Sequence, residues 1–263
     1  MPNWVKNKII VGNSEFGRRL IDKYSTLNKD TKEIEFDFNK VIEMPKELQI
    51  EFSSKSDSAL CLYLTRINPL ITYYGLNNDK LDEDEYNKLI NKFKDKTTVS
   101  TSFTISKDKI NELILKYDED ELLSLGERQV DNVVKYNAIN WYEWSISNWG
   151  TKWNASNFKT SDNNRILMFE TAWEPVREII VEISKQNPDI KFGFLYSDEA
   201  IGSHVGYLLL KAGHIDFEGT FEDYSVDAYK LAFDLWECED DYEYDQELGT
   251  YALKEDSEES FIN

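Results

Sequence analysis

Residues 165–196 read RILMFETAWEPVREIIVEISKQNPDIKFGFLY, and this stretch decides the fold class of the chain. The segment from Arg165 to Trp173 is rich in apolar and β-branched residues, which predicts a strand. Pro175 stands where a helix can begin, and isoleucines recur at helical spacing until Asn187-Pro188, where the helix should end. A further apolar run, Ile190 to Tyr196, completes a β-α-β unit.

The N-terminal residues predict the same order of elements. Lys8 to Val11 is a short apolar run closed by Gly12-Asn13, which is typical of a strand and a turn. Apolar side chains recur at helical spacing from Phe16 to Tyr24. Apolar and acidic residues alternate from Ile34 to Phe38, which predicts a second strand before Pro45. Two β-α-β halves are the element order of a ferredoxin-like split sandwich.

We therefore predict an α+β protein with a ferredoxin-like split βαβ sheet, a large and mostly helical insertion, and an added C-terminal hairpin. The four strands of the motif should lie in one sheet, near residues 7–11, 33–38, 165–173 and 190–196. Two short apolar runs on either side of Gly213 predict the added hairpin, at residues 207–210 and 215–221.

The predicted domains follow from these elements. The sheet domain should comprise residues 1–45 and 165–235. Residues 46–164 should form the insertion, because apolar residues keep helical spacing in three segments, 82–93, 106–117 and 127–149. Residues 236–263 remain as an acidic C-terminal segment.

Acidity is the strongest compositional signal. The chain has 50 Asp and Glu against 30 Lys and Arg, a formal net charge of −20. Seventeen of the acidic residues, and only two lysines, lie between His214 and Asn263. Phosphate contacts need clustered basic residues, so direct nucleic-acid binding is not expected. A basic protein surface is the partner that such a charge distribution suits.

Several other functional classes find no support in the residues. No apolar run is long enough for a signal peptide or a membrane helix, which predicts a soluble protein that stays where it is made. Cys61 and Cys238 are isolated and are expected to be free thiols. His204 and His214 are the only histidines and suggest no catalytic triad. We expect no cofactor, no metal site and no enzymatic turnover.

Four stretches resemble a known family: Met1-Pro2-Asn3-Trp4, Phe36 to Ile42, Trp149 to Ala155 and Thr171 to Pro175. They are similar to the YubB-like proteins of phages and plasmids. The resemblance implies a ferredoxin-like domain, an origin on a mobile genetic element and a location in the cytoplasm of the host bacterium. It implies no catalytic residues, and it does not cover residues 53–135 or the tail.

Tryptophans are concentrated around the third of these stretches. They form either the aromatic wall of a ligand pocket or the packing between lobes, and the large buried area of an indole favours packing. The residues concerned are Trp141, Trp144, Trp149, Trp153 and Trp173.

One enzymatic alternative is open. Arg66, Ser100-Thr101-Ser102 and Glu119-x-Glu121 are the residue types that ADP-ribosyltransferases gather around NAD. The intervening residues have helical spacing and leave little room for the strands of such a site, so a strand or a helix cap is favoured there.

The sequence leads to a functional hypothesis: a phage or plasmid accessory protein that binds and inhibits a basic host factor handling nucleic acids, such as a CRISPR effector or another defence nuclease. The alternatives are a housekeeping role in replication or conjugation through protein contacts, and a nucleotide-processing transferase. The expected contact residues are acids with interleaved tyrosines, which a solvated tail would also explain: Glu239, Asp240, Asp241, Tyr242, Glu243, Tyr244 and Asp245.

Overall fold

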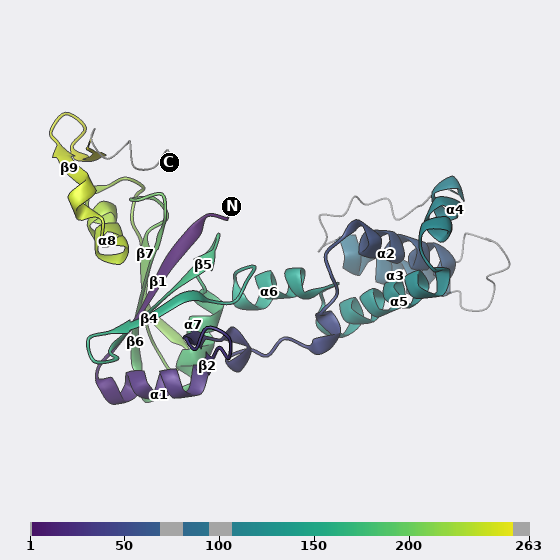
Figure 1. Cartoon of the computed structure of the whole chain (residues 1–263), viewed down its shortest axis with the longest axis horizontal. Coiled ribbons are helices and arrows are strands. Elements are labelled where there is room, and N and C mark those ends of the chain that lie inside the picture. The colour runs from purple at the N-terminus through teal and green to yellow at the C-terminus, as the bar shows by residue number, and fades with distance from the viewer. Residues whose placement is uncertain (1, 69–80, 95–106, 255–263) are drawn as a thin grey trace. The chain divides into compact units, whose positions relative to one another are not determined.

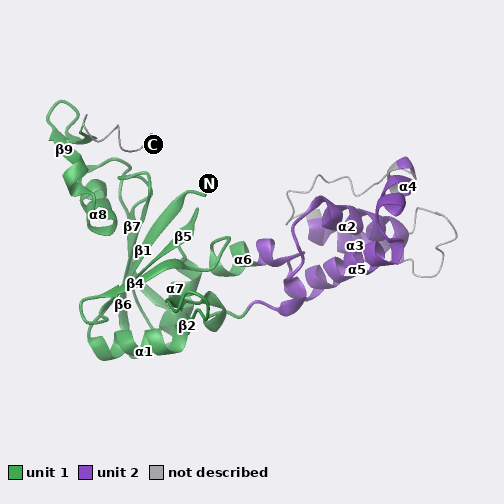
Figure 2. Ribbon diagram, in the orientation of Figure 1, with its two compact units in different colours: residues 1–43, 145–263 green, residues 44–144 purple. Residues whose placement is uncertain are grey.

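The computed structural model describes residues 2–68, 81–94 and 107–254 (Figure 1). It divides into two compact units (Figure 2). Unit 1 comprises residues 1–43 and 145–263, and unit 2 comprises residues 44–144. No described helix is long and apolar enough to cross a membrane.

A six-stranded antiparallel sheet is the centre of unit 1. Its strand order is β4-β5-β1-β6-β7-β8. In chain order the strands are β1 (Trp4–Val11), β4 (Ser156–Ser161), β5 (Ile166–Ala172), β6 (Lys191–Asp198), β7 (Gly206–Lys211) and β8 (His214–Thr220). Helix α1 (Ser14–Tyr24) follows β1, and α7 (Arg177–Gln186) joins β5 to β6. The first four strands of that order, with these two helices, form the ferredoxin-like split βαβ arrangement.

The predicted fold class is therefore confirmed, and one of its strands is corrected. Residues 34–36 form β3 (Ile34–Phe36), which pairs with β2 (Ser25–Leu27) in a separate two-stranded sheet. The alternation at 34–38 serves packing instead: Phe36 and Phe38 are buried, and the Phe36 ring stacks on Phe169 with the centroids 5.1 Å apart. The second strand of the motif is β4, whose polar and largely exposed side chains give no apolar signal.

The added hairpin is present as β7 and β8, which extend the sheet beyond β6. The domain boundaries differ from the predicted ones. Residues 145–164 belong with the sheet unit rather than with the insertion, because β4 lies there and pairs with β5. Residues 237–254 also belong to unit 1, where their aromatic side chains pack on the preceding helix.

The two faces of the sheet have different coverings. Alternate residues of β1, β5 and β6 are buried on the face that carries the core, among them Val5, Ile9, Phe169 and Phe192. The opposite face carries Lys8, whose ammonium group bonds Asp234 of α8 (Val226–Trp236). Helix α8 therefore lies on the face opposite the core.

Unit 2 is helical. Its elements are α2 (Ser54–Ile67), α3 (Glu83–Lys94), α4 (Lys107–Lys116), α5 (Glu119–Tyr136) and the beginning of α6 (Trp141–Trp149). Gly126 allows close packing of α5 on α2, since a Cβ atom there would lie 2.4 Å from the Ala59 carbonyl oxygen. The predicted helix at 127–149 is two helices, because Asn137 adopts a left-handed conformation that ends α5.

Candidate functional site

The four sequence stretches that carry the family resemblance meet at one end of the sheet. Trp4 and Trp153 place their ring centroids 6.3 Å apart. The Thr151 hydroxyl donates to the Ala172 carbonyl at 2.7 Å, and the Trp173 amide donates to the Asn3 carbonyl at 2.8 Å. The Phe38 amide donates to the Asn154 side chain at 2.8 Å, which attaches the remaining stretch.

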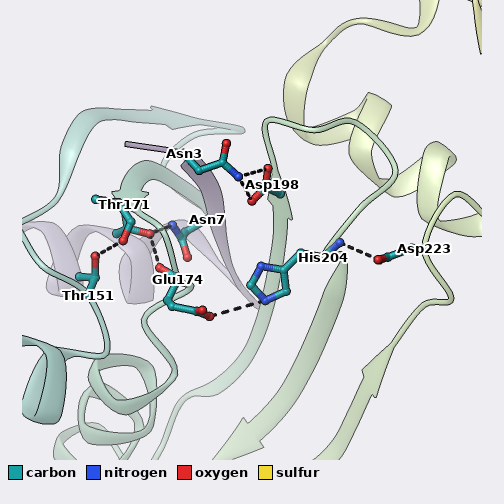
Figure 3. Close-up of polar contacts among 9 residues, drawn as sticks. Asn3, Asn7, Thr151, Thr171, Glu174, Asp198, His204 and Asp223 are labelled. Atoms are coloured by element: carbon teal, nitrogen blue, oxygen red, sulfur yellow. Dashed lines mark hydrogen bonds and ion pairs between the residues drawn. The ribbon is translucent and has the colours of Figure 1, made fainter. Parts of the chain in front are cut away.

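The turn after β5 is held by a chain of hydrogen bonds (Figure 3). The buried Asn7 amide donates to the Thr171 hydroxyl at 2.8 Å, and that hydroxyl donates to the Glu174 carbonyl at 2.8 Å. Within this turn Trp173 has a φ of +73°, a left-handed conformation that is unfavourable for a bulky residue. Such a conformation costs about 1–3 kcal/mol and persists where neighbouring contacts enforce it.

The loop between β6 and β7 lies beside this turn. Asp198 accepts two bonds from the Asn3 amide, at 2.8 and 2.6 Å, and one from the Ala200 backbone. The His204 backbone donates to the Asp223 carboxylate at 2.9 Å. The His204 Nε2 lies 3.7 Å from a Glu174 carboxylate oxygen, a distance at which a protonated imidazole would form a weak ion pair (Figure 3).

Charged groups surround a tyrosine next to this loop. The Tyr196 ring lies 5.5 Å from the His204 ring, and burial, with the nearby Glu218 and Glu174 carboxylates, raises the pKa of Tyr196. Arg177 bonds Glu218 at 3.1 Å, and this bond lowers the pKa of the Glu218 carboxyl. The phenol therefore stays protonated and neutral at physiological pH.

The tryptophans have two different roles. Trp144 and Trp149 are only 5% and 4% exposed, and the Trp149 indole donates to the Ile42 carbonyl, so these two indoles are packing residues, while packing between lobes stays a prediction. Trp153 and Trp173 are 38% and 52% exposed. The packing interpretation therefore does not extend to these two residues.

The acidic C-terminal residues, up to Lys254, form an ordered substructure that we name the acidic module, residues 221–254. It contains α8, a 3₁₀ turn (Glu239–Asp241) and a hairpin of β9 (Tyr242–Asp245) and β10 (Thr250–Leu253). An aromatic cluster holds these elements together: Tyr242 and Tyr251 each lie 5.1 Å from the Phe233 ring. Burial raises the pKa of Tyr242 to about 12.

The predicted contact residues lie in this module in three kinds of position. Glu239, Asp240, Glu243 and Tyr244 are exposed. Asp245 closes the hairpin turn, since its carboxylate accepts the backbone N–H groups of residues 247 and 248 at 2.7 and 3.1 Å. Tyr242, with Asp241 beside it, is half-buried and belongs to the scaffold of the module. Sequence reasoning missed this scaffold, although Tyr229 and Phe233 recur at helical spacing in α8.

The module is attached to the face of the sheet that carries Lys6 and Lys8. Lys8 and Asp234 form an ion pair at 2.7 Å. The Lys6 ammonium lies 4.5 Å from the centre of the Trp236 ring, and the Trp236 indole donates to the Ser197 carbonyl at 3.4 Å. The beginning of the module is also fixed, because the residue 224 amide donates to the residue 202 carbonyl at 2.7 Å.

The residues of the transferase hypothesis lie in unit 2 or outside the described residues. Ser100 to Ser102 lie outside them. Glu119 and Glu121 stand in the first turn of α5, where Glu121 bonds Lys55. Arg66 lines a surface depression of about 500 Å³ together with Asp120 and Glu127, rather than with the Glu-x-Glu carboxylates.

The described residues hold no group of three or more His, Cys, Asp or Glu arranged to bind a metal ion. Cys61 and Cys238 are free and partly buried, and burial raises the pKa of both thiols. Neither cysteine is therefore an activated nucleophile.

The ferredoxin-like sheet of unit 1 agrees with the protein family that this part of the sequence matches. Residues 148–256 match the ferredoxin-like domain in Api92-like proteins. The matched segment begins within α6, before β4, and includes the turn at 171–174 and the acidic module. The crystal structure of the protein api92 from Yersinia pseudotuberculosis is similar over 84% of this chain and 99% of its own, with 12% identity and a TM-score of 0.37. No curated protein matches the sequence.

Proposed function

We propose that this protein is a binding protein whose acidic module occupies a basic surface of a partner protein. The observation that carries the proposal is that exposed carboxylates stand on a 3₁₀ turn and the hairpin after it, and that an aromatic cluster holds the hairpin to α8. Ordered charges lose less conformational entropy on binding than charges on a mobile tail. Complementary charge also steers association and raises its rate.

Three exposed carboxylates form the proposed contact, those of Glu239, Asp240 and Glu243. Within the described residues, none of the three forms an ion pair. The Lys254 ammonium bonds the Asp240 backbone carbonyl at 2.6 Å rather than a carboxylate, so a basic partner can pair with these three acids without breaking an ion pair of the described chain. Tyr244, which is 53% exposed, adds aromatic contact area beside them.

We further propose that the partner handles nucleic acid in the host. Nucleases and other nucleic-acid-binding effectors expose basic grooves for phosphates, and an acidic protein surface can occupy such a groove as a nucleic-acid mimic. The resemblance to YubB-like proteins implies an origin on a phage or plasmid, and inhibition of host defence, for example as an anti-CRISPR protein, is a role that suits such an element. The charge distribution supports a protein partner over nucleic acid itself.

The test is affinity capture from a lysate of the natural host with three forms of the full chain. The first is the wild type. The second, the hairpin variant, carries Glu239→Gln, Asp240→Asn and Glu243→Gln. The third, a matched control, carries Glu51→Gln, Glu83→Gln and Asp84→Asn, three exposed acids of unit 2. Both variants change the net charge by three.

We expect the wild type and the control to retain the same basic nucleic-acid-binding protein, and the hairpin variant to lose it. Binding should weaken steeply with salt, because exposed charges are screened over about 8 Å at physiological ionic strength. Equal capture by the wild type and the hairpin variant would contradict the proposal. Loss of capture in the control alone would place the contact on the helical unit, near residues 82–85.

A further inference from the structure

Lysine side chains of this chain lie over two of its indole rings. The Lys152 ammonium lies 4.5 Å from the centre of the Trp153 ring, and Lys6 lies at the same distance from Trp236. Among the described residues no lysine or arginine lies over the ring of Trp173, which is the most exposed indole of that part of the chain, at 52%. A cation from another molecule is the natural partner for that ring.

The residue after this indole supplies a carboxylate. The Glu174 side chain is 64% exposed, and its one ion-pair neighbour in the described residues is His204 at 3.7 Å. An exposed indole and an exposed carboxylate on successive residues are the two groups that bind a guanidinium, which stacks on an aromatic face and donates two parallel hydrogen bonds to a carboxylate.

The backbone holds this pair in place before any ligand arrives. The Trp173 amide bonds the Asn3 carbonyl, and the Glu174 amide and carbonyl bond Ala172 and Thr171. The left-handed φ of +73° at Trp173 would be relieved by glycine, so the backbone conformation alone does not favour tryptophan here. Costly conformations that neighbouring contacts enforce cluster at binding sites.

The pair is continuous with the acidic module. His204 connects them, because its side chain lies near Glu174 and its backbone bonds Asp223 at the start of the module. Tyr224, the next residue, is 52% exposed. A basic surface seated on the module would therefore extend towards Trp173.

We propose that Trp173 and Glu174 form the receptor for an arginine side chain of the basic partner. This inference rests on the proposed function and adds a specificity to it: arginine is preferred to lysine, because only the planar guanidinium both stacks and donates in parallel. Glu239, Asp240 and Glu243 attract the basic partner by charge, and the Trp173 indole discriminates arginine from lysine.

The test uses the full chain and two probes, deca-arginine and deca-lysine peptides, with affinities measured by calorimetry at a fixed salt concentration. We expect the wild type to bind deca-arginine more tightly than deca-lysine. Trp173→Gly should weaken deca-arginine binding by about two- to fivefold, the range of an exposed cation–π contact, and remove the preference. Glu174→Gln leaves the turn intact and should reduce the same preference.

Trp153→Ala is the matched control, because Lys152 already covers that indole, and it should leave the preference unchanged. Circular dichroism should show that Trp173→Gly is folded at the temperature of the titration, since glycine tolerates the left-handed backbone. An arginine preference that persists in both Trp173→Gly and Glu174→Gln would overturn the inference while leaving the proposed function standing. If the hairpin variant bound both peptides as tightly as the wild type does, that result would instead contradict the proposed function.

Discussion

The acidic residues of unit 2 and those of the acidic module differ in what they do for the fold. In unit 2 they gather at helix N-termini: Glu83 to Glu85 open α3, and Glu119 to Glu121 open α5 behind the N-cap Asp118. Carboxylates there compensate the helix dipole and bond free backbone N–H groups. In the acidic module Glu239 and Asp240 lie in the 3₁₀ turn and Glu243 lies in β9, and among the described residues their carboxylates form no capping bond and no ion pair. Acids without a structural role are the better candidates for a functional one.

The largest expected effect is on the scaffold that presents the hairpin acids. Phe233 is 5% exposed and contacts Tyr242 and Tyr251. Phe233→Ala should destabilise the module by about 3–5 kcal/mol, because a large buried ring is lost and a cavity remains. Amide hydrogen exchange should then accelerate in residues 242–253 and stay unchanged in the helices of unit 2. Unchanged protection of the hairpin would mean that the aromatic cluster is not its support.

An effect of intermediate size, on the free energy of unfolding, distinguishes the acids at helix N-termini from those of the acidic module. The Asp118 carboxylate accepts the Glu121 amide at 2.9 Å, so Asp118→Ala should destabilise unit 2 by about 1 kcal/mol in denaturant unfolding. Glu239→Gln, at an exposed position without such a bond, should change stability by less than about 0.5 kcal/mol. Equal losses for the two variants would abolish the distinction between structural and functional acids.

The smallest effect near neutral pH concerns the Tyr242 hydroxyl. Burial raises its pKa to about 12, whereas an unfolded tyrosine titrates near about 10. The folded state therefore disfavours the phenolate, and stability that is complete below about pH 10 should fall as the pH rises towards 12. Thermal melts of Tyr242→Phe should lose much of this alkaline decline, with Tyr244→Phe as the exposed control. A decline of the same size in Tyr242→Phe would show that another group causes it.

The sequence determined the elements whose own residues carry the signal. Apolar periodicity predicted β1, β5, α7, β6 and β7, because these elements bury one face or both. Strand β8 has no buried residue and was predicted from its apolar residues after the turn at Gly213. The sequence also located the regional acidity, which requires only counting. Strand β4 was not predicted, because an edge strand of polar residues, SNFKTS, has no periodic apolar face.

Tertiary structure decided which of the apolar segments pair as strands of the central sheet and which only pack their side chains against it. The alternation at Ile34 to Phe38 is a valid strand signal, yet Phe36 stacks on Phe169 while a distant segment, β4, takes the place in the sheet. In the same way, only the fold brings Glu174 and His204 together and sets Tyr242 against Phe233. Each of these contacts joins residues whose spacing along the chain has no period, so only the packed structure could place them side by side.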